Sequence, residues 1–518
     1  MQRFFFFFLL ITIPFYNVKS ATTFYPAEVF LMQDGDYFFH TVEPGQTVFS
    51  ISRMYHLTEE DIYRLNPESR EVIKIGAQLK IPQESGSYYY HTIQPKETLY
   101  SVSRMYQMKG EDIISVNPGL SVETFTIGKV IRIPTNRVTT PMTGPSEEYV
   151  QKVTEDLLKP SVEIKNLGTI RIALLLPFTS DVRARMVEYF EGFLLALEDI
   201  KKQGIAVHMK VHDIGKGTDS LPSLFQQQSM QNVHLIFGGL YNEQIRMIAN
   251  FSREYDIPYV IPFNPLSDET MAYSTVYQAN TPRSYMFFRA SSAFCNKYRD
   301  AEIVFHVPSK PGNRADFVRE IQRELKAKNI PYQVLTKDVL SVSDISTFLN
   351  TKKNTVFVPS DDGAEALSKL IIPLRSALDS NSQLLVSLFG YQTWQSYVAD
   401  YLKDFSRFNA TFFSNYYVNP ASAKFKSFYN NYIRWYSKDL INAYPKYGLL
   451  GYDSGMFFIQ ALNRYGNTFA ANIHQFKYSG IQIDFDLERV NNWGGFINTN
   501  VYFVDFLPNG TINSKSVK

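Results

Sequence analysis

Apolar and polar residues follow two different patterns along this chain. Between residues 37 and 134, short alternating segments flank stretches in which apolar side chains recur every three or four positions, as at Val48, Ile51 and Tyr55. This spacing predicts short amphipathic helices between short strands. From residue 168 onward, continuous apolar runs such as residues 170–176 alternate with longer stretches of helical spacing. Such runs are typical of strands covered on both faces of a parallel sheet.

The first pattern occurs twice. Residues 40–42 (HTV) match residues 91–93 (HTI), and residues 52–55 match residues 103–106, at an offset of 51. Each copy is predicted to form a strand, two helices and a closing strand, with Thr58 in the N-cap position of the second helix of the first copy and Asp61 three residues on. The two copies are therefore an internal repeat of a small βααβ unit.

The two repeats resemble the LysM family. The residues that carry the resemblance are His40-Thr41-Val42, Gly45-Gln46-Thr47, Ile51, Tyr55, Asn66-Pro67 and 76–82, then Glu97-Thr98-Leu99, Asn117-Pro118 and 128–134. The resemblance implies a shallow groove that binds peptidoglycan or another glycan containing N-acetylglucosamine. It places in the groove Gly45, Gln46, Thr47, Val48, Asn66, Pro67, Ile73 and Ile75 of the first repeat, and Glu97, Thr98, Leu99, Asn117, Pro118 and Ile127 of the second.

The two repeats differ at one groove position. Lys96 stands in the second repeat where the first has Gly45. Lys96 either weakens glycan binding or adds a salt bridge to an acidic stem peptide, and we expect the first repeat to be the better glycan site. Asn66 has two readings: it contacts the glycan, or it only caps the end of a helix. Two weak sites on one chain would together give useful avidity.

The chain from residue 168 is predicted to be a two-lobed α/β domain. Strands at residues 170–176, 206–212, 235–237 and 258–261 alternate with helices, and four further strands follow, at residues 303–306, 333–335, 355–358 and 384–388. Eight such units exceed one sheet of usual size, so two lobes are expected, with a break near residues 263–285. Two more strands, at residues 481–485 and 502–506, and a turn at Asn509-Gly510 are expected near the end.

This second region resembles the type I periplasmic-binding-protein family of amino-acid-binding and receptor ligand-binding domains. The resemblance rests on residues 172–178, the helix around Gly192, residues 236–239 and 257–262, and Tyr447-Gly448-Leu449-Leu450-Gly451-Tyr452-Asp453. It implies a ligand cleft between the lobes, at the carboxyl ends of the strands. The residues at those ends are Phe178, Thr179, Tyr241, Asn242, Phe263 and Asn264. Tyr241-Asn242 replace the hydroxyl side chains usual in the amino-acid binders, which argues against an amino acid as the ligand.

The first residues predict export. A basic residue, Arg3, precedes an apolar stretch at residues 4–15, which is too short to cross a bilayer, and small residues lead up to Ala21. We expect residues 1–20 to be a signal peptide and the mature protein to lie in the periplasm beside the cell wall; an uncleaved anchor is the alternative. The expected domains are then repeat 1 (37–82), repeat 2 (88–134), a linker and tether (135–167) with a short helix at residues 147–158, and the bilobed domain (168–510).

The composition and the short motifs argue against several classes of partner and site. A formal net charge of +2 without long basic runs argues against nucleic acid as a partner. Cys295 is the only cysteine and is expected to be buried, and the eight histidines lack ligand spacing, so neither a metal site nor a cofactor is expected. No nucleophile elbow or phosphate loop is present. Asp453 is interpreted as lying near a helix N-terminus, and the pairs Asp361/Asp362 and Asp484/Asp486 as a helix cap and as solvated strand residues.

These patterns predict a non-catalytic, exported peptidoglycan-binding protein that places a bilobed sensing domain on the wall, with a small polar molecule in its cleft. The alternative is an interaction protein with an empty cleft that regulates or scaffolds peptidoglycan synthesis and docks a cell-wall synthesis protein. An enzyme is the third and least supported class, because no hydrolase motif accompanies the repeats.

Overall fold

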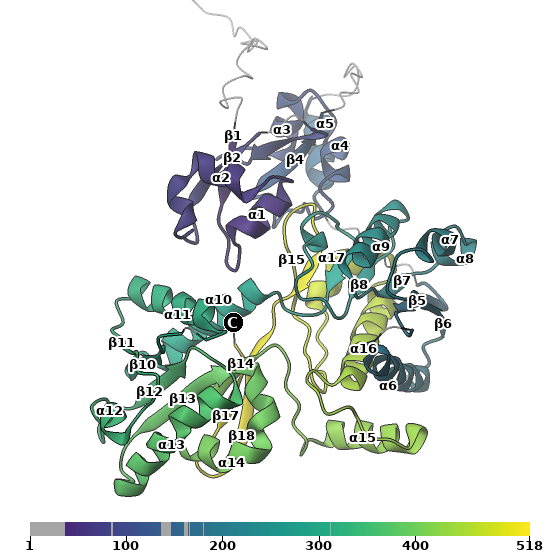
Figure 1. The fold of residues 1–518 in the computed structure, drawn as a ribbon. Helices are drawn as coiled ribbons and strands as arrows, with labels where there is room; N and C mark the ends of the chain where they lie inside the picture. Colours follow the sequence, from purple (N-terminus) through teal and green to yellow (C-terminus); the bar gives the residue numbers. More distant parts are fainter. Residues whose placement is uncertain are drawn as a thin grey trace, which may run out of the picture.

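The computed structural model describes residues 37–83, 86–135, 147–159, 164, 166–179, 181–310 and 312–517. The expected signal peptide and part of the linker lie outside these residues. The two repeats sit together on top of a larger, two-lobed body (Figure 1). None of the helices described there has both the length and the apolar character needed to span a membrane.

Both repeats have the βααβ plan that their patterns predicted. In each, the first and last strands pair antiparallel and two helices pack against them. Thr58 caps the second helix of repeat 1 and pairs reciprocally with Asp61, as expected. The elements of repeat 1 are β1 (Tyr37–Thr41), α1 (Val48–Met54), α2 (Glu59–Leu65) and β2 (Gln78–Pro82), and those of repeat 2 are β3 (Tyr88–Thr92), α3 (Leu99–Met105), α4 (Gly110–Ser115) and β4 (Val130–Pro134). The expected tether helix is present as α5 (Glu147–Asp156) and packs beside α3.

The larger body has one seven-stranded sheet in each lobe, which confirms the predicted two-lobed α/β fold. The sheet of lobe 1 has the order β15-β16-β9-β8-β7-β5-β6, and that of lobe 2 has the order β11-β10-β12-β13-β14-β17-β18. Six neighbouring strands of the lobe 1 sheet (β16 to β6) and five of the lobe 2 sheet (β11 to β14) pair in parallel, and antiparallel pairs stand at one end of each sheet only. Helices cover both sheets (Figure 1).

The bounds of these elements follow the predicted alternation closely. The strands of lobe 1 are β5 (Ile170–Leu176), β6 (Val207–Asp213), β7 (Leu235–Gly238), β8 (Tyr259–Ile261), β9 (Val276–Gln278), β15 (Leu487–Arg489) and β16 (Phe496–Asn498). Its helices are α6 (Arg183–Lys202), α7 (Leu221–Phe225), α8 (Gln228–Gln231), α9 (Asn242–Glu254), α15 (Ala423–Tyr436), α16 (Tyr447–Tyr465) and α17 (Phe469–Asn472). The strands of lobe 2 are β10 (Glu302–His306), β11 (Gln333–Leu335), β12 (Thr355–Pro359), β13 (Val386–Tyr391), β14 (Thr411–Ser414), β17 (Val501–Phe506) and β18 (Ile512–Val517). Its helices are α10 (Arg283–Lys297), α11 (Ala315–Ala327), α12 (Val342–Ser346), α13 (Ala364–Ser380) and α14 (Val398–Arg407).

The chain crosses between the lobes three times. The crossings follow β9, β14 and β16, so the expected break near residues 263–285 is one of three connections. Side chains tie two of them together: Thr281 Oγ1 donates to the carbonyl of Asn500 at 2.8 Å, and Asn498 Nδ2 donates to the carbonyl of Ala279 at 3.0 Å. The crossings are therefore held in a fixed relation where the two lobes join.

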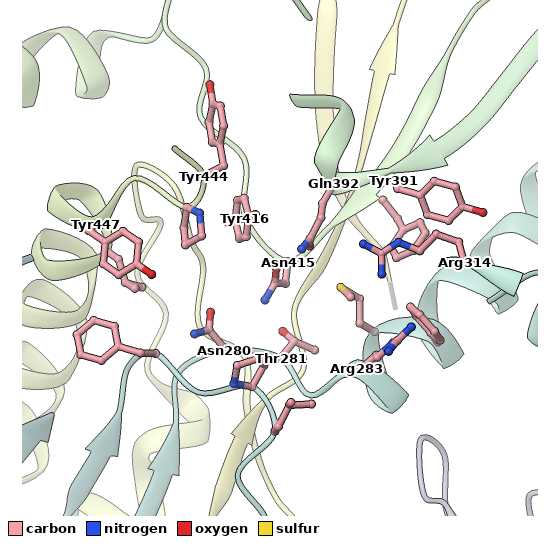
Figure 2. A pocket seen from close by; sticks show the side chains of 18 residues that line it. Asn280, Thr281, Arg283, Arg314, Tyr391, Gln392, Asn415, Tyr416, Tyr444 and Tyr447 are labelled. Atoms are coloured by element: carbon pink, nitrogen blue, oxygen red, sulfur yellow. The ribbon is translucent and has the colours of Figure 1, made fainter. Parts of the chain in front are cut away.

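Helices α6 and α16 of lobe 1 cross with their backbones in contact. A Cβ atom at Gly192 would lie 1.8 Å from the carbonyl oxygen of Gly448, and one at Gly451 would lie 2.0 Å from that of Tyr189. Only glycine permits this approach. The contact fixes the first turn of α16, which carries Tyr447 toward the space between the lobes (Figure 2).

Two expectations about acidic residues are wrong. Asp453 lies inside α16, not near its N-terminus, and is fully buried. Its carboxylate accepts hydrogen bonds from the backbone N–H groups of residues 481, 482 and 483. Those donors belong to the stretch 481–485, which was predicted to be a strand and has no regular structure. Consequently Asp484 and Asp486 do not alternate on a strand either.

The other acidic pair also departs from the expectation of a solvated helix cap. Asp361 accepts the N–H of Gly363, just before α13, as a capping residue would. Asp362, however, is buried and forms an ion pair with Arg314 at 2.6 Å. Cys295 is buried, as expected, and burial raises the pKa of its thiol to about 12.

The repeats are attached to lobe 1 by the loop between β15 and β16. Trp493 of that loop is buried against Tyr55 and Tyr90, one tyrosine from each repeat, and the Arg132 guanidinium lies 4.6 Å from its ring. Asn492 donates to the carbonyl of Val130 at 2.9 Å. A buried aromatic residue at the centre and satisfied backbone groups around it are typical of a stable domain interface. The repeats thus sit on lobe 1 in a defined orientation.

Candidate functional site

The turn that opens each groove is built around a buried histidine. In repeat 1, Gln46 Oε1 accepts the N–H of Glu43 at 2.8 Å and lies 2.8 Å from His40 Nε2. Because the amide oxygen accepts from the backbone, Nε2 carries the proton, and Nδ1 accepts from the Tyr55 hydroxyl at 2.7 Å. Burial lowers the pKa of His40, so the ring stays neutral in this arrangement.

Repeat 2 has the same turn with a charged residue in place of Gln46. Glu97 Oε2 accepts from His91 Nε2 at 2.8 Å and from the N–H of Gln94 at 2.7 Å. Burial pushes the pKa of Glu97 upward, but these two hydrogen bonds outweigh it and hold the pKa below its ordinary value. Gln46 in repeat 1 and Glu97 in repeat 2 therefore both hold the turn through the same two hydrogen bonds.

Gly45 and Lys96 occupy the same unusual backbone conformation. Their φ angles are 76° and 70°, in the left-handed region that favours glycine. The aromatic ring of Tyr285 lies directly against Gly45, where a Cβ atom would be 2.6 Å from it. Repeat 2 holds a lysine in this conformation at a cost in stability.

Replacing Lys96 by glycine is therefore expected to stabilise repeat 2 by about 0.5–1 kcal/mol, because it relieves the positive φ. Hydrogen exchange of the amides in β3 and β4 would show stronger protection. The matched change, Gly45→Ala, should weaken protection of β1 and β2, since it adds strain and meets Tyr285. Equal protection in Lys96→Gly and the original chain would contradict this reading.

Asn66 and Asn117 hold the two ends of each repeat together. Asn66 Nδ2 donates to the carbonyls of Ile62 and Lys80, both at 2.8 Å, while its Oδ1 accepts the N–H of Lys80 at 2.9 Å. Asn117 makes the same three bonds in repeat 2. Both side chains are buried. Their amides are thus occupied in joining the second helix to the last strand, and the residues that follow, Pro67 and Pro118, turn the chain away from that helix.

Six of the eight groove residues expected in repeat 1 surround one cavity. It measures about 570 Å³ and lies between repeat 1, the loop after β8, and helices α10 and α11. The repeat contributes Gly45, Gln46, Thr47, Val48, Ile73 and Ile75 to its wall. Ile75 is 52% exposed, which leaves an apolar side chain free for contact with a ligand. The geometry suits a sugar chain, which binds through backbone polar groups and apolar contact.

The corresponding residues of repeat 2 have a different setting. Thr98 caps α3 and Leu99 is fully buried beneath it, whereas Ile127 is 66% exposed, as Ile75 is in repeat 1. The edge of this groove at Pro118 is followed by Gly119, whose N–H donates to Asn492 of lobe 1 at 2.7 Å. Repeat 2 thus keeps the exposed apolar side chain of the groove but lacks the glycine turn.

A second cavity, of about 360 Å³, lies between the lobes (Figure 2). Its aromatic lining includes Tyr391, Tyr416, Tyr444 and Tyr447, and Figure 2 shows the polar side chains of Asn280, Thr281, Gln392 and Asn415 around the same space. Its two arginines are already paired, Arg314 with Asp362 and Arg283 with Asp316. The lining is therefore aromatic and polar, with its positive charges neutralised.

Two amide oxygens of residues that line this cavity have no partner among the residues that the structure describes. They are Gln392 Oε1 and Asn415 Oδ1, and both are buried. A buried polar atom without a partner costs about 1–3 kcal/mol. Both oxygens can therefore still accept a hydrogen bond from an O–H or N–H group.

Of the six cleft residues expected from the sequence, Phe263 lines this cavity. Asn242 and Asn264 meet each other at 2.8 Å, and Phe178 packs against Phe190. Thr179 lies beside Asp213, and Tyr241 immediately precedes α9. Most of the lining comes instead from lobe 2 and from residues 415–447, which the crossing after β14 brings into the cleft. The sequence signal nearest to it was Tyr447, at the start of the motif that suggested the family.

Residues 40–82 and 91–134 each match the family model of the LysM domain. A Bacillus subtilis (strain 168) protein, YdhD, which carries the description of a sporulation-specific glycosylase, is 33% identical over 97 residues. That stretch is 19% of this chain and 22% of the relative, so the chain spans about a fifth of the relative's length.

Solved structures similar to this chain are substrate-binding proteins of transporters. One is an ABC transporter substrate-binding protein of Desulfitobacterium hafniense in complex with Leu, 14% identical, covering 67% of this chain and 100% of that one at a TM-score of 0.40. Another is a branched-chain amino acid ABC transporter periplasmic ligand-binding protein of Burkholderia xenovorans LB400, 13% identical, covering 67% and 94% at a TM-score of 0.44. The chain thus contains two LysM domains, followed by a two-lobed α/β domain.

Proposed function

We propose that this protein is exported, binds peptidoglycan through its two LysM repeats without catalysing a reaction, and presents a bilobed ligand-binding domain beside the wall. The observation that carries the proposal is the cavity on repeat 1, where six groove residues expected from the sequence meet around one space. The apolar stretch at residues 4–15 supports export.

The glycan claim can be tested with a pair of equivalent exposed residues. Ile75→Arg and Ile127→Arg should each weaken binding of the N-acetylglucosamine tetramer at their own repeat by about tenfold, because each removes apolar contact with the sugar. Isothermal titration of the original chain, of each single variant and of the double variant separates the two sites. Because repeat 1 is expected to bind glycan better, Ile75→Arg should lower the overall affinity of the chain for the tetramer more than Ile127→Arg does.

Both side chains are at least half exposed, so their replacement should leave the urea midpoint nearly unchanged. That measurement is the control for folding. Unchanged affinity in the double variant would place the glycan elsewhere and refute the groove.

For the interlobe cavity we propose a small uncharged ligand that has hydroxyl or amide donors and an apolar face. Both arginines of the lining are already paired with aspartates, which disfavours a carboxylate ligand, and the two amide oxygens without a partner among the described residues favour a ligand with donors. Sugars and their amide derivatives have both properties, and aromatic side chains commonly pack against their apolar faces.

A thermal-shift screen with neutral sugars, muropeptides, nucleosides and amino acids would test this ligand class. A stabilising sugar whose effect is lost in Asn415→Leu would support it, because that variant keeps the size of the side chain and removes the acceptor. Stabilisation by amino acids alone would contradict it. Silence from the whole panel, together with a co-purified cell-wall synthesis protein, would favour the role of an interaction protein instead.

A further inference from the structure

The cavity on repeat 1 is bounded by both lobes of the larger domain as well as by the repeat. Pro265, Leu266 and Asp268 of lobe 1 form one part of its wall, and Tyr285 and Phe288 of α10 in lobe 2 form another. Repeat 1 is fixed to lobe 1 by the ion pair between Arg53 and Asp268 and by the packing around Trp493. It touches lobe 2 through the contact of Gly45 with Tyr285. Repeat 1 therefore bridges the two lobes on one side.

Helix α10 belongs to lobe 2 and lies next to repeat 1. It begins at Arg283, two residues after Thr281, which is bonded to Asn500 at the crossing between the lobes. A rotation of lobe 2 about the crossings carries α10 with it, whereas repeat 1 is attached to lobe 1. We therefore expect the distance between Tyr285 and Gly45 to change with the angle between the lobes.

Two segments, the loop after β8 and the first turns of α10, line both cavities. Pro265, Leu266, Arg283 and Phe287 line both the cavity on repeat 1 and the cavity between the lobes. Leu266 is 74% exposed, which is unusual for a leucine between two structured bodies. A molecule in either cavity thus meets residues that also face the other.

We propose that a glycan bound at repeat 1 lies between that repeat and α10, contacts both, and thereby sets the distance between the two lobes. A ligand that contacts two bodies stabilises the arrangement in which both contacts are made, and shifts the population toward it. The coupling is reciprocal, so a ligand in the interlobe cavity changes the glycan affinity of repeat 1 by the same factor. Repeat 2 is attached to lobe 1 through Asn492. We therefore expect that a glycan bound to repeat 2 does not change the distance between the lobes. This inference rests on the proposed binding of glycan by the repeats.

The test is a distance measurement between the lobes by electron spin resonance. Spin labels are placed on Lys201→Cys in lobe 1 and Lys352→Cys in lobe 2, two exposed positions, while the buried Cys295 stays unlabelled. The full chain is measured with and without saturating N-acetylglucosamine tetramer. We expect the tetramer to shift the mean distance by more than about 2 Å.

Three variants locate the origin of the shift. At the tetramer concentration that half-saturates the original chain, Ile75→Arg should reduce the shift about fivefold, because its site is then about tenfold weaker and mostly empty, whereas the matched Ile127→Arg should retain it. Tyr285→Ala, measured at a tetramer concentration that titration shows to be saturating, should reduce it. An undiminished shift in Ile75→Arg at the half-saturating concentration would overturn the proposal, because the signal would then come from elsewhere.

Binding and coupling fail in different ways. If titration detects no binding of the tetramer to the doubly labelled chain, the proposed function itself is wrong and the coupling falls with it. If the tetramer binds while the distance between the labels stays unchanged, the glycan-binding function stands and the inference is overturned.

Discussion

Replacing Gly451 by alanine is expected to destabilise lobe 1 by at least about 3 kcal/mol, the upper end of what overpacking a core costs. The added methyl group would lie 2.0 Å from the carbonyl oxygen of Tyr189, a backbone atom that moves only if α6 moves. Urea unfolding followed by circular dichroism would show a lower midpoint. Since α16 also brings Tyr447 into the interlobe cavity, ligand binding there should weaken as well.

Gly217→Ala is the matched control, because Gly217 is exposed and its Cβ position has ample space. Its free energy of unfolding should stay within about 0.5 kcal/mol of the original. An unchanged urea midpoint in Gly451→Ala would mean that the two helices do not cross as closely as described.

The second large effect concerns pH. Burial raises the pKa of Asp453 from 3.8 to about 7, while the N–H donors of residues 481–483 oppose the rise. The folded chain therefore keeps a proton that the unfolded chain has released above pH 4. The free energy of unfolding should fall as pH rises from about 4 to 7, by up to about 4 kcal/mol for this one group.

Asp453→Asn isolates this contribution. The variant carries no titrating group at this position, so its free energy of unfolding lacks this pH dependence. The free energy of unfolding of the original chain minus that of the variant should therefore fall as pH rises from about 4 to 7. Asp219→Asn, at an exposed site, should follow the original curve. A pH-independent difference between Asp453→Asn and the original chain would contradict the assignment.

The sequence predicted the elements wherever local pattern and tertiary environment agree. The strand at residues 170–176 was recognised because a continuous apolar run needs two covered faces, and six of the seven residues of β5 are buried. The repeats were recognised because residues 40–42 and 52–55 recur at residues 91–93 and 103–106 with the same spacing. In each case the information lies within a few neighbouring residues.

The stretch 481–485 shows where local pattern fails. Its apolar residues alternate as in a strand, but its backbone donors are taken by Asp453, which lies almost 30 positions earlier in the chain. A buried carboxylate thus replaces the neighbouring strand that the pattern suggested. Neither partner alone reveals this bond.

The interlobe cavity was hidden from the sequence for a similar reason. Its lining is assembled from both lobes by the three crossings, so Asn280, Arg314, Asn415 and Tyr447 become neighbours only in the folded chain. Strand ends predicted the lobe 1 side through Phe263. They could not predict residues that approach from a loop between helices, such as Tyr444.

The repeats are proposed to hold the protein on the cell wall. Co-sedimentation of the full chain with purified peptidoglycan sacculi measures this attachment, with the Ile75→Arg/Ile127→Arg double variant as the comparison. We expect the original chain to sediment with the sacculi and the folded double variant to stay in the supernatant. If the original chain also stays in solution, or if both proteins sediment equally, the repeats do not hold the protein on the wall through these grooves.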